Sequence, residues 1–414
     1  MKRFALSIIC LAAALSTTAA GQTRDAARRR AMPPAARFAS GRSPLRVPFD
    51  LSNDLVLIRG RVNASAPLWF IFDTGASVTV IDAKAARRLR LKTRGSVTGT
   101  GAAGEATAAR LDAASISFGG AVVDNLTLYA LPLESFAASF GRPVGGVVGN
   151  DVIGRFVVEI DYAKRVVNFH DPASYHYRGA GSVVPVTIED DGLPFARGEV
   201  EIEGRAPLAC KFEIDTGSTG AVLFNTPFVR EHDLLSSVSR SKGINIGGVG
   251  GTGSAVLGRV GAVRLGGFTL REPVARFPQA TKGDYASDKY DALMGGEVFR
   301  RFKLVVDLSR RRLIFEPNAA LADPFEADMS GIELVADGAR FSTYLIDDVD
   351  KGSPADEAGV RGGDILTAID SRPARSLTLE EIRAMFRRDG QEYLLTLRRG
   401  GRIVRARVKL RRMV

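Results

Sequence analysis

Cysteine and histidine are scarce in this chain, which has two Cys and three His among its 414 residues. The histidines are His170, His176 and His232, and none of them has the i, i+4 spacing with which a helix binds zinc. The sequence therefore gives little support to a metal site or to a Ser-His-Asp triad. We expect neither a metal nor a cofactor.

The two cysteines lie far apart in the sequence. Cys10 lies in an apolar stretch near the N-terminus, whereas Cys210 lies in a strand-like segment that leads to Asp215. If the N-terminal stretch is removed, Cys210 has no partner and the chain can form no internal disulfide. No histidine is obviously paired with Cys210, so we interpret it as a small core residue and not as a nucleophile.

Long apolar runs are also few. The clearest one, Phe4 to Leu15, follows Lys2 and Arg3 and is followed by the small residues 16–20. It is shorter than the roughly 20 residues that a membrane-spanning helix needs. The pattern predicts a cleaved signal peptide over residues 1–20 and a periplasmic or secreted protein, with an uncleaved membrane anchor as the alternative.

Positive charge exceeds negative charge by 11 at pH 7, and by nine if Lys2 and Arg3 leave with the signal peptide. The excess is arginine spread along the chain, with a local run at Arg28-Arg29-Arg30 and a basic C-terminal strand. A nucleic-acid interface would gather these charges on one face among aromatic residues, so we expect no nucleic-acid partner. Solvated arginines are the simplest interpretation, and peripheral association with an anionic envelope surface is the alternative.

The most informative feature that is present is an Asp-Thr-Gly tripeptide, which occurs twice and each time follows an apolar run. Asp73-Thr74-Gly75 follows residues 70–72, and Asp215-Thr216-Gly217 follows residues 212–214. Because Asp and Gly both favour turns, one copy alone could be an ordinary turn. Two copies matter only if their surroundings match as well.

The surroundings do match, which indicates a duplicated domain. Aligning Gly149 on Gly295 also superimposes Phe156 on Phe302, Asp161 on Asp307 and Phe169 on Phe315. Short apolar runs broken by glycine predict strands almost throughout, with a helix from Ala83 to Leu91. We therefore expect a linker over 21–44, lobe 1 over 45–175 and lobe 2 over 176–322, with one aspartate in each lobe near a pseudo-twofold axis.

Each lobe also has a glycine-rich segment between its aspartate and its closing strand. Both segments spell G-x-G-x-x-G, but a strand-like segment follows the second copy where a dinucleotide site would need a helix. We interpret them instead as mobile hairpin tips, or flaps, that close over a cleft. The candidate flap glycines are Gly99, Gly101, Gly104, Gly248, Gly250 and Gly253.

The two lobes, over about residues 45–318, resemble the aspartic peptidases and specifically their retropepsin-like branch. The resemblance implies a mainly β fold of two pseudo-symmetric, β-barrel-like lobes in which Asp73 and Asp215 activate a water molecule. It further implies that Thr74 and Thr216 lock the two loops together, while Gly75 and Gly217 leave backbone N–H groups free near the carboxylates. Ser77 and Ser218 are weaker candidates for hydrogen bonds around the pair. Neither hairpin contains a tyrosine, which argues for an arrangement with two flaps.

Residues 325–414 resemble a PDZ domain, on the segments Gly352-Ser353-Pro354-Ala355 and Gly363-Asp364-Ile365-Leu366. An amphipathic helix is predicted over 378–388. The resemblance implies an α+β domain that binds a peptide's free C-terminus between this helix and a sheet edge. The peptide-binding candidates are Gly331, Ile332, Glu333 and Leu334, although this loop has fewer glycines than the usual form. A domain used only for packing against the lobes is the alternative.

These patterns together predict an exported aspartic endopeptidase that acts on polypeptides, with a PDZ domain that recruits or senses a polypeptide C-terminus. The alternative is a catalytically silent scaffold that binds peptides with the same fold.

Overall fold

The computed structural model describes residues 8–10 and 35–414. Most of the predicted signal peptide, the start of the predicted linker and the Arg28–Arg30 run lie outside the described residues. The short strand β1 (Ile8–Cys10) pairs in parallel with β18 of lobe 2. Among the described residues, no helix is long and apolar enough to cross a membrane.

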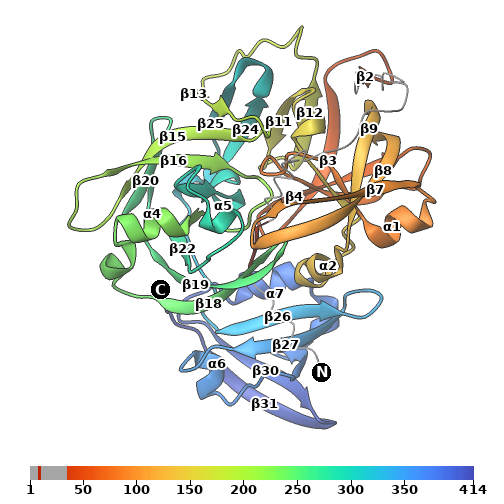
Figure 1. The fold of residues 1–414 in the computed structure, drawn as a ribbon. Coiled ribbons are helices and arrows are strands. Elements are labelled where there is room, and N and C mark those ends of the chain that lie inside the picture. The colour runs from red at the N-terminus through yellow and green to blue at the C-terminus, as the bar shows by residue number, and fades with distance from the viewer. Residues whose placement is uncertain (1–7, 11–34) are drawn as a thin grey trace.

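The fold is mainly β, as predicted, and its two lobes lie side by side with the third domain packed below them in Figure 1. Lobe 1 forms most of a 14-stranded sheet, which also contains three strands of lobe 2. The elements of lobe 1 are β2 (Ala35–Phe38), β3 (Leu45–Ser52), β4 (Leu55–Val62), β5 (Leu68–Phe72), β6 (Val80–Asp82), α1 (Ala83–Arg88), β7 (Thr93–Gly101), β8 (Gly104–Phe118), β9 (Ala121–Leu131), α2 (Glu134–Phe140), β10 (Gly146–Val148), α3 (Asn150–Ile153), β11 (Val157–Asp161) and β12 (Val166–His170).

Lobe 2 repeats the strand order of lobe 1. In lobe 1 the strand β10 runs parallel to β5 and antiparallel to β6, and in lobe 2 the strand β23 runs parallel to β16 and antiparallel to β17. The elements of lobe 2 are β13 (Ser182–Pro185), β14 (Thr187–Ile188), β15 (Pro194–Glu201), β16 (Leu208–Ile214), β17 (Val222–Phe224), α4 (Thr226–Glu231), η1 (Leu234–Ser237), β18 (Lys242–Gly248), β19 (Gly251–Arg259), β20 (Ala262–Leu265), β21 (Phe268–Arg271), β22 (Val274–Pro278), η2 (Asp284–Ala286), β23 (Ala292–Met294), α5 (Gly296–Phe299), β24 (Phe302–Asp307), η3 (Leu308–Arg310), β25 (Arg312–Pro317) and η4 (Ala319–Ala322).

The lobes are joined through a shared part of the large sheet, in which β11 of lobe 1 pairs antiparallel with β24 of lobe 2. Val158 lies opposite Val306 and Ile160 lies opposite Leu304 in this register. All four side chains are buried in the main core, which spans both lobes. Burial of such apolar side chains stabilises the pairing by about 1.5–3 kcal/mol for each one.

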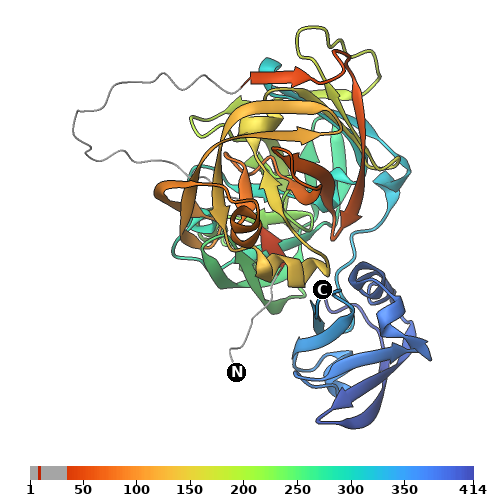
Figure 2. The same cartoon turned by 90° about the vertical axis from the view of Figure 1, so that its right-hand side faces the viewer.

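The third domain has its own core and a six-stranded sheet in the order β26-β27-β28-β30-β31, with β29 paired to β28. In Figure 2 its ribbon lies below the lobes and to one side of them. Phe325 and Val414, at the two ends of the predicted domain, nevertheless pack in the core of the lobes. Its elements are β26 (Ile332–Asp337), β27 (Thr343–Val349), α6 (Pro354–Glu357), β28 (Ile365–Ile369), β29 (Arg372–Pro373), η5 (Ala374–Ser376), α7 (Leu379–Met385), β30 (Glu392–Arg399) and β31 (Arg402–Lys409).

Both predicted helices are present but shorter than predicted. Helix α1 begins after Asp82, whose carboxylate accepts a hydrogen bond from the N–H of Ala85. Helix α7 begins after Thr378, which forms a reciprocal capping box with Glu381. Caps of this kind supply partners for the free N–H groups of a first turn and thereby fix where each helix begins.

Candidate active site

Each Asp-Thr-Gly loop begins where a buried strand ends. Strand β5 runs into Asp73, whose N–H donates to the carbonyl oxygen of Val148 at 3.0 Å. Strand β16 runs into Asp215, whose N–H donates to the carbonyl oxygen of Met294 at 3.1 Å. The chain thus continues the pairing with β10 or β23 by one residue before it turns, and this anchors the backbone of each aspartate in the same way.

The two threonines cross-link the loops. The hydroxyl of Thr74 donates to the carbonyl oxygen of Ile214 at 2.5 Å, and the hydroxyl of Thr216 donates to that of Phe72 at 2.8 Å. Each hydroxyl also accepts from the N–H of the opposite threonine, at 3.0 and 3.1 Å. Four hydrogen bonds therefore join the lobes at fully buried residues, where an unpaired polar group would be costly.

The glycines bring each carboxyl group against the opposite loop. A Cβ atom added to Gly75 would lie 2.5 Å from the carboxyl carbon of Asp215, and one added to Gly217 would lie 2.2 Å from that of Asp73. In addition, the N–H of Gly75 donates to Asp73 Oδ1 and that of Gly217 donates to Asp215 Oδ1, each at 2.8 Å. Only glycine leaves room for a carboxyl group at these two places.

The environment of the pair disfavours two negative charges. Both aspartates are fully buried. Burial, then the neighbouring charge of Asp215, raises the pKa of Asp73 well above its usual range. Burial also raises the pKa of Asp215 to about 6, although hydrogen bonds from Asp73, Gly217 and Ser218 oppose this shift. The pair is therefore suited to hold one proton near neutral pH, and that proton belongs to both carboxyl groups.

The two serine candidates differ from each other. The backbone of Ser218 donates a hydrogen bond that lowers the pKa of Asp215, whereas the Ser77 hydroxyl has no hydrogen-bond partner in the described part of the chain. Asn150 and Thr79 support lobe 1 without having been predicted. The Asn150 amide donates to the carbonyl oxygen of Thr74 at 2.7 Å, and the Thr79 hydroxyl accepts from the N–H of Gly149 at 3.1 Å.

The glycine-rich segments form two hairpins, as predicted, between β7 and β8 and between β18 and β19. Their tips touch, because the N–H of Ala103 donates to the carbonyl oxygen of Val249 at 3.0 Å. A Cβ atom on Gly101 would lie 2.5 Å from that same oxygen, and Gly250 packs against the backbone of Gly104. Gly101, Gly104 and Gly250 thus permit the contact. Gly101 and Gly104, like Gly99, Gly248 and Gly253, belong to the paired strands of the hairpins.

The predicted carboxylate-binding loop of the third domain already holds a carboxylate. Asp328 Oδ1 accepts hydrogen bonds from the N–H groups of Ser330 and Gly331, at 2.9 and 2.8 Å, and from the Ser330 hydroxyl at 2.8 Å. The N–H of Ile332 donates to the Ser330 hydroxyl at 3.0 Å. A free C-terminus could use these donors only by displacing Asp328.

The predicted peptide groove between β26 and α7 is filled by lobe 1. Gly141, which ends α2, lies between the two elements: a Cβ atom on it would be 2.9 Å from the Cβ of Leu379 and 3.5 Å from that of Ala336. Arg383 of α7 donates to the carbonyl oxygens of Ser139 at 2.8 Å and Leu334 at 3.2 Å. Since β26 is the edge strand of its sheet, these contacts lie where a peptide would add.

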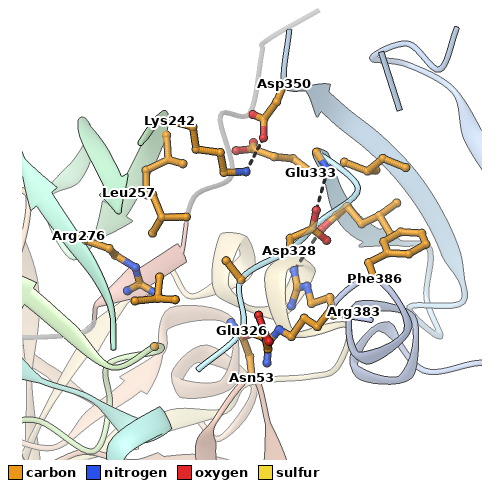
Figure 3. A pocket seen from close by; sticks show the side chains of 18 of the residues that line it. Asn53, Lys242, Leu257, Arg276, Glu326, Asp328, Glu333, Asp350, Arg383 and Phe386 are labelled. Carbon is orange, nitrogen blue, oxygen red and sulfur yellow. Dashed lines mark hydrogen bonds and ion pairs between the residues drawn. The ribbon is translucent and has the colours of Figure 1, made fainter. Parts of the chain in front are cut away.

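A cavity of about 160 Å³ extends from this groove into lobe 2 (Figure 3). Gly331, Ile332, Glu333 and Leu334, the predicted peptide-binding residues, all line it. Lys242 of lobe 2 closes one side through an ion pair with Asp350 at 2.5 Å. Glu333 Oε2 has no hydrogen-bond partner among the described residues, and burial with nearby aspartates raises the pKa of Glu333 to about 8.

Comparison with known protein families agrees with this arrangement. Residues 58–152 match the family model described as aspartyl protease, and residues 345–399 match that of the PDZ domain. The predicted resemblance to both families is thereby confirmed. The first match contains Asp73, while Asp215 is linked to it by the structural repeat. No curated protein matches the chain.

In the ranges 8–10 and 35–414, no group of three or more His, Cys, Asp or Glu side chains is arranged to hold a metal ion. Cys210 is buried and free, and burial raises its thiol pKa well above the usual value, as befits a core residue.

Proposed function

From a segment of aspartyl protease type and a second lobe that repeats its loop, we propose that the chain is an exported aspartic endopeptidase. The observation that carries the proposal is the reciprocal packing of each carboxyl group over the other loop's glycine. This packing brings Asp73 and Asp215 together in a buried site whose environment favours one shared proton. Export rests on the predicted signal peptide alone.

In the proposed reaction the pair binds a water molecule and the carbonyl group of a peptide bond. The ionised carboxylate takes a proton from the water, whose oxygen attacks the carbonyl carbon. The protonated carboxyl group donates a hydrogen bond to the carbonyl oxygen as negative charge develops there. Proton transfer to the amide nitrogen then lets the carbon–nitrogen bond break, and the pair returns to its one-proton state. The two flaps would cover the substrate and exclude other water.

We further propose that the PDZ domain senses a polypeptide segment in competition with lobe 1. Its groove is filled around Gly141, so a ligand could enter only when α2 leaves. Helix α2 lies only five residues before β10, the strand that accepts the hydrogen bond from the N–H of Asp73. Ligand binding would therefore act on the backbone that positions the catalytic pair.

The test is cleavage of an unfolded protein by the wild type, Asp73→Asn and Asp215→Asn, over a pH range of about 4 to 8. Loss of cleavage in both variants, with unchanged circular dichroism, is the expected result. The alternative function is a catalytically silent peptide-binding scaffold. It would be favoured if the folded wild type cleaves nothing at any pH but still binds unfolded chains.

A further inference from the structure

Glu213 is a buried acid in the wall of the candidate active site that the proposed reaction does not use. It lies two residues before Asp215 in β16, and side chains two residues apart in a strand point to the same face. Glu213 therefore faces the same side of the strand as the catalytic carboxyl group. The matching residue of lobe 1 is Ile71, two residues before Asp73, so the duplicated walls differ in charge at this point.

The Glu213 side chain is 1% exposed, and its Oε1 atom has no hydrogen-bond partner among the described residues. Tyr290 lies against it and interacts with the carboxyl group. Burial, followed by the charges of Asp215 and Asp284, raises the pKa of Glu213 well above its usual range. A buried acid that has a free acceptor atom and other acids as neighbours lacks a positive partner.

Asp284 is the second acid of this cluster. It lies in η2, and its Oδ2 atom is buried without a hydrogen-bond partner in the described chain. Burial raises its pKa to about 6, while the charge of Lys289 lowers it. Lys289 is more than half exposed and forms its ion pair with Asp191, at 3.7 Å. Among the described residues, no Lys or Arg side chain forms an ion pair with Glu213 or Asp284 within 4 Å.

The position of η2 connects this cluster to the flap of lobe 1. The N–H of Tyr285 donates to the carbonyl oxygen of Ala102 at 3.2 Å, and Gly283 packs against the backbone around Gly104. The turn that carries Asp284 thus packs against the tip of the flap. Asp284 also interacts electrostatically with Asp215, so this turn connects the surroundings of the aspartate pair with the backbone of the lobe 1 flap.

The corresponding wall of lobe 1 is apolar. Ile71 packs in one buried cluster with Leu131 and Val147 of its own lobe and with Val249, which lies in the flap of lobe 2. The two walls therefore offer different chemistry to the two side chains that flank a bond held at the catalytic pair.

We propose that Glu213 and Asp284 form a specificity pocket for a positively charged lysine or arginine side chain of the substrate, on the lobe 2 side of the cleaved bond. The apolar wall around Ile71 binds an apolar side chain on the other side. This inference rests on the proposed peptidase function and names its substrate class. A bound cation supplies the partner that the buried acids lack, and it forms the strong, charge-assisted type of hydrogen bond.

The test compares cleavage of octapeptides that have Phe-Lys, Lys-Phe, Phe-norleucine or norleucine-Phe at the centre. Norleucine keeps the aliphatic chain of lysine and removes the charge. For the wild type we expect kcat/KM to be at least about tenfold higher for one lysine peptide than for its norleucine match. Glu213→Ile, which copies lobe 1, should reverse this ratio, and Asp284→Asn should reduce it.

The ratio is measured within one enzyme, so a partial loss of folding does not affect it. Glu199→Gln is the matched control, because Glu199 is an exposed residue of lobe 2 paired with Arg264. It should keep the wild-type ratio. A wild-type ratio near one for both peptide orders, or a ratio unchanged in Glu213→Ile, would overturn the pocket.

Failure of the peptidase function would appear separately, as no cleavage of any peptide by the folded wild type. In that case the affinity of the same peptides is measured by fluorescence anisotropy. A preference for lysine that Glu213→Ile removes would still support the pocket. Equal binding of lysine and norleucine peptides, or no binding of either, would overturn it.

Discussion

Lobes 1 and 2 share the same strand order, yet they use one connection in opposite ways. In lobe 1 the chain between β9 and β10 forms α2, which points outward and fills the groove of the PDZ domain. In lobe 2 the matching chain between β22 and β23 forms η2, which carries Asp284 and packs against the flap of lobe 1. One connection therefore contacts another domain, while the other contacts the flap of the opposite lobe.

The features that are the same in both lobes are those through which the two lobes contact each other. Thr74 and Thr216 exchange the same hydrogen bonds, and Gly75 and Gly217 each make room for the opposite carboxyl group. The features that differ, such as Ile71 against Glu213, act within one wall only. Symmetry therefore persists where the two halves build one group and is lost where each half makes contacts of its own.

The largest effect is expected when one of the two equivalent glycines, Gly75 or Gly217, is replaced. Gly217→Ala places a Cβ atom 2.2 Å from the carboxyl carbon of Asp73, so the carboxyl group must move. We expect kcat/KM to fall at least about 100-fold and the free energy of unfolding to fall by about 1–3 kcal/mol. Gly75→Ala should behave alike, whereas Gly243→Ala, which has open space around it, should not. Enzyme assays and urea unfolding measure these effects, and a fully active Gly217→Ala enzyme would contradict the described packing.

The second prediction concerns the pH dependence of the shared proton. The active form holds one proton on the pair; burial raises the pKa of Asp215 to about 6, and burial with the charge of Asp215 raises that of Asp73 well above its usual range. Above about pH 6 the one-proton form dominates, and below it both carboxyl groups are protonated. We therefore expect kcat/KM to fall about tenfold for each pH unit below that value. Glu213→Gln removes the neighbouring buried acid, so a fall in kcat/KM that persists in this variant belongs to the aspartate pair. Maximal activity near pH 3 would contradict the assignment of the fall to protonation of the pair near pH 6.

A smaller effect is expected when the cross-link of the loops is weakened from either side. Thr74→Val and Thr216→Val each remove a buried hydroxyl that donates to the other lobe and accepts from it. Each change should lower the free energy of unfolding by about 1–3 kcal/mol. The double variant should lose less than the sum, because the two residues share partners. Chemical denaturation of all four proteins measures this, and strongly unequal single effects would show that the lobes are not equivalent here.

The smallest effect is expected at the contact between α2 of lobe 1 and α7 of the third domain. Arg383→Ala removes the hydrogen bonds that join α7 to Ser139 and Leu334, which should weaken docking by about 1 kcal/mol. Amide hydrogen exchange in β26 should then become about fivefold faster. Arg388→Ala is the control, because Arg388 is exposed next to the same helix. Equal exchange in both variants would indicate that Arg383 does not hold the domains together.

The sequence was sufficient for the features that repeat locally. Asp73 and Asp215 were predicted as a pair because each lies in a short motif at the end of an apolar run, and the motif occurs in both lobes. The hairpins and both helices were predicted from glycine spacing and periodicity, although their ends depended on the caps at Asp82 and Thr378.

What could not be predicted depends on contacts between distant segments. The repeat shows that Glu213 is the charged counterpart of Ile71. The acidic cluster that we assign to Glu213 also needs Asp284, however, which lies in a distant connection of the chain. In the same way, nothing local in residues 139–141 reveals that they lie against α7, more than 200 positions later. Asn150 has Gly296 as its counterpart in lobe 2, so the repeat gave no signal for its hydrogen bond to the Thr74 carbonyl.

The pairing of β11 with β24 joins the two lobes, and with them the two halves of the aspartate pair, within a single chain. An assembly of two identical chains would have to carry the same residue at both copies of every position, and it would come apart on dilution. In this chain the halves meet at an effective concentration that is independent of the amount of protein. A single mutation can therefore change the wall of one lobe without changing the wall of the other. The two walls can in this way be fitted separately to a substrate that has unlike side chains on the two sides of the cleaved bond.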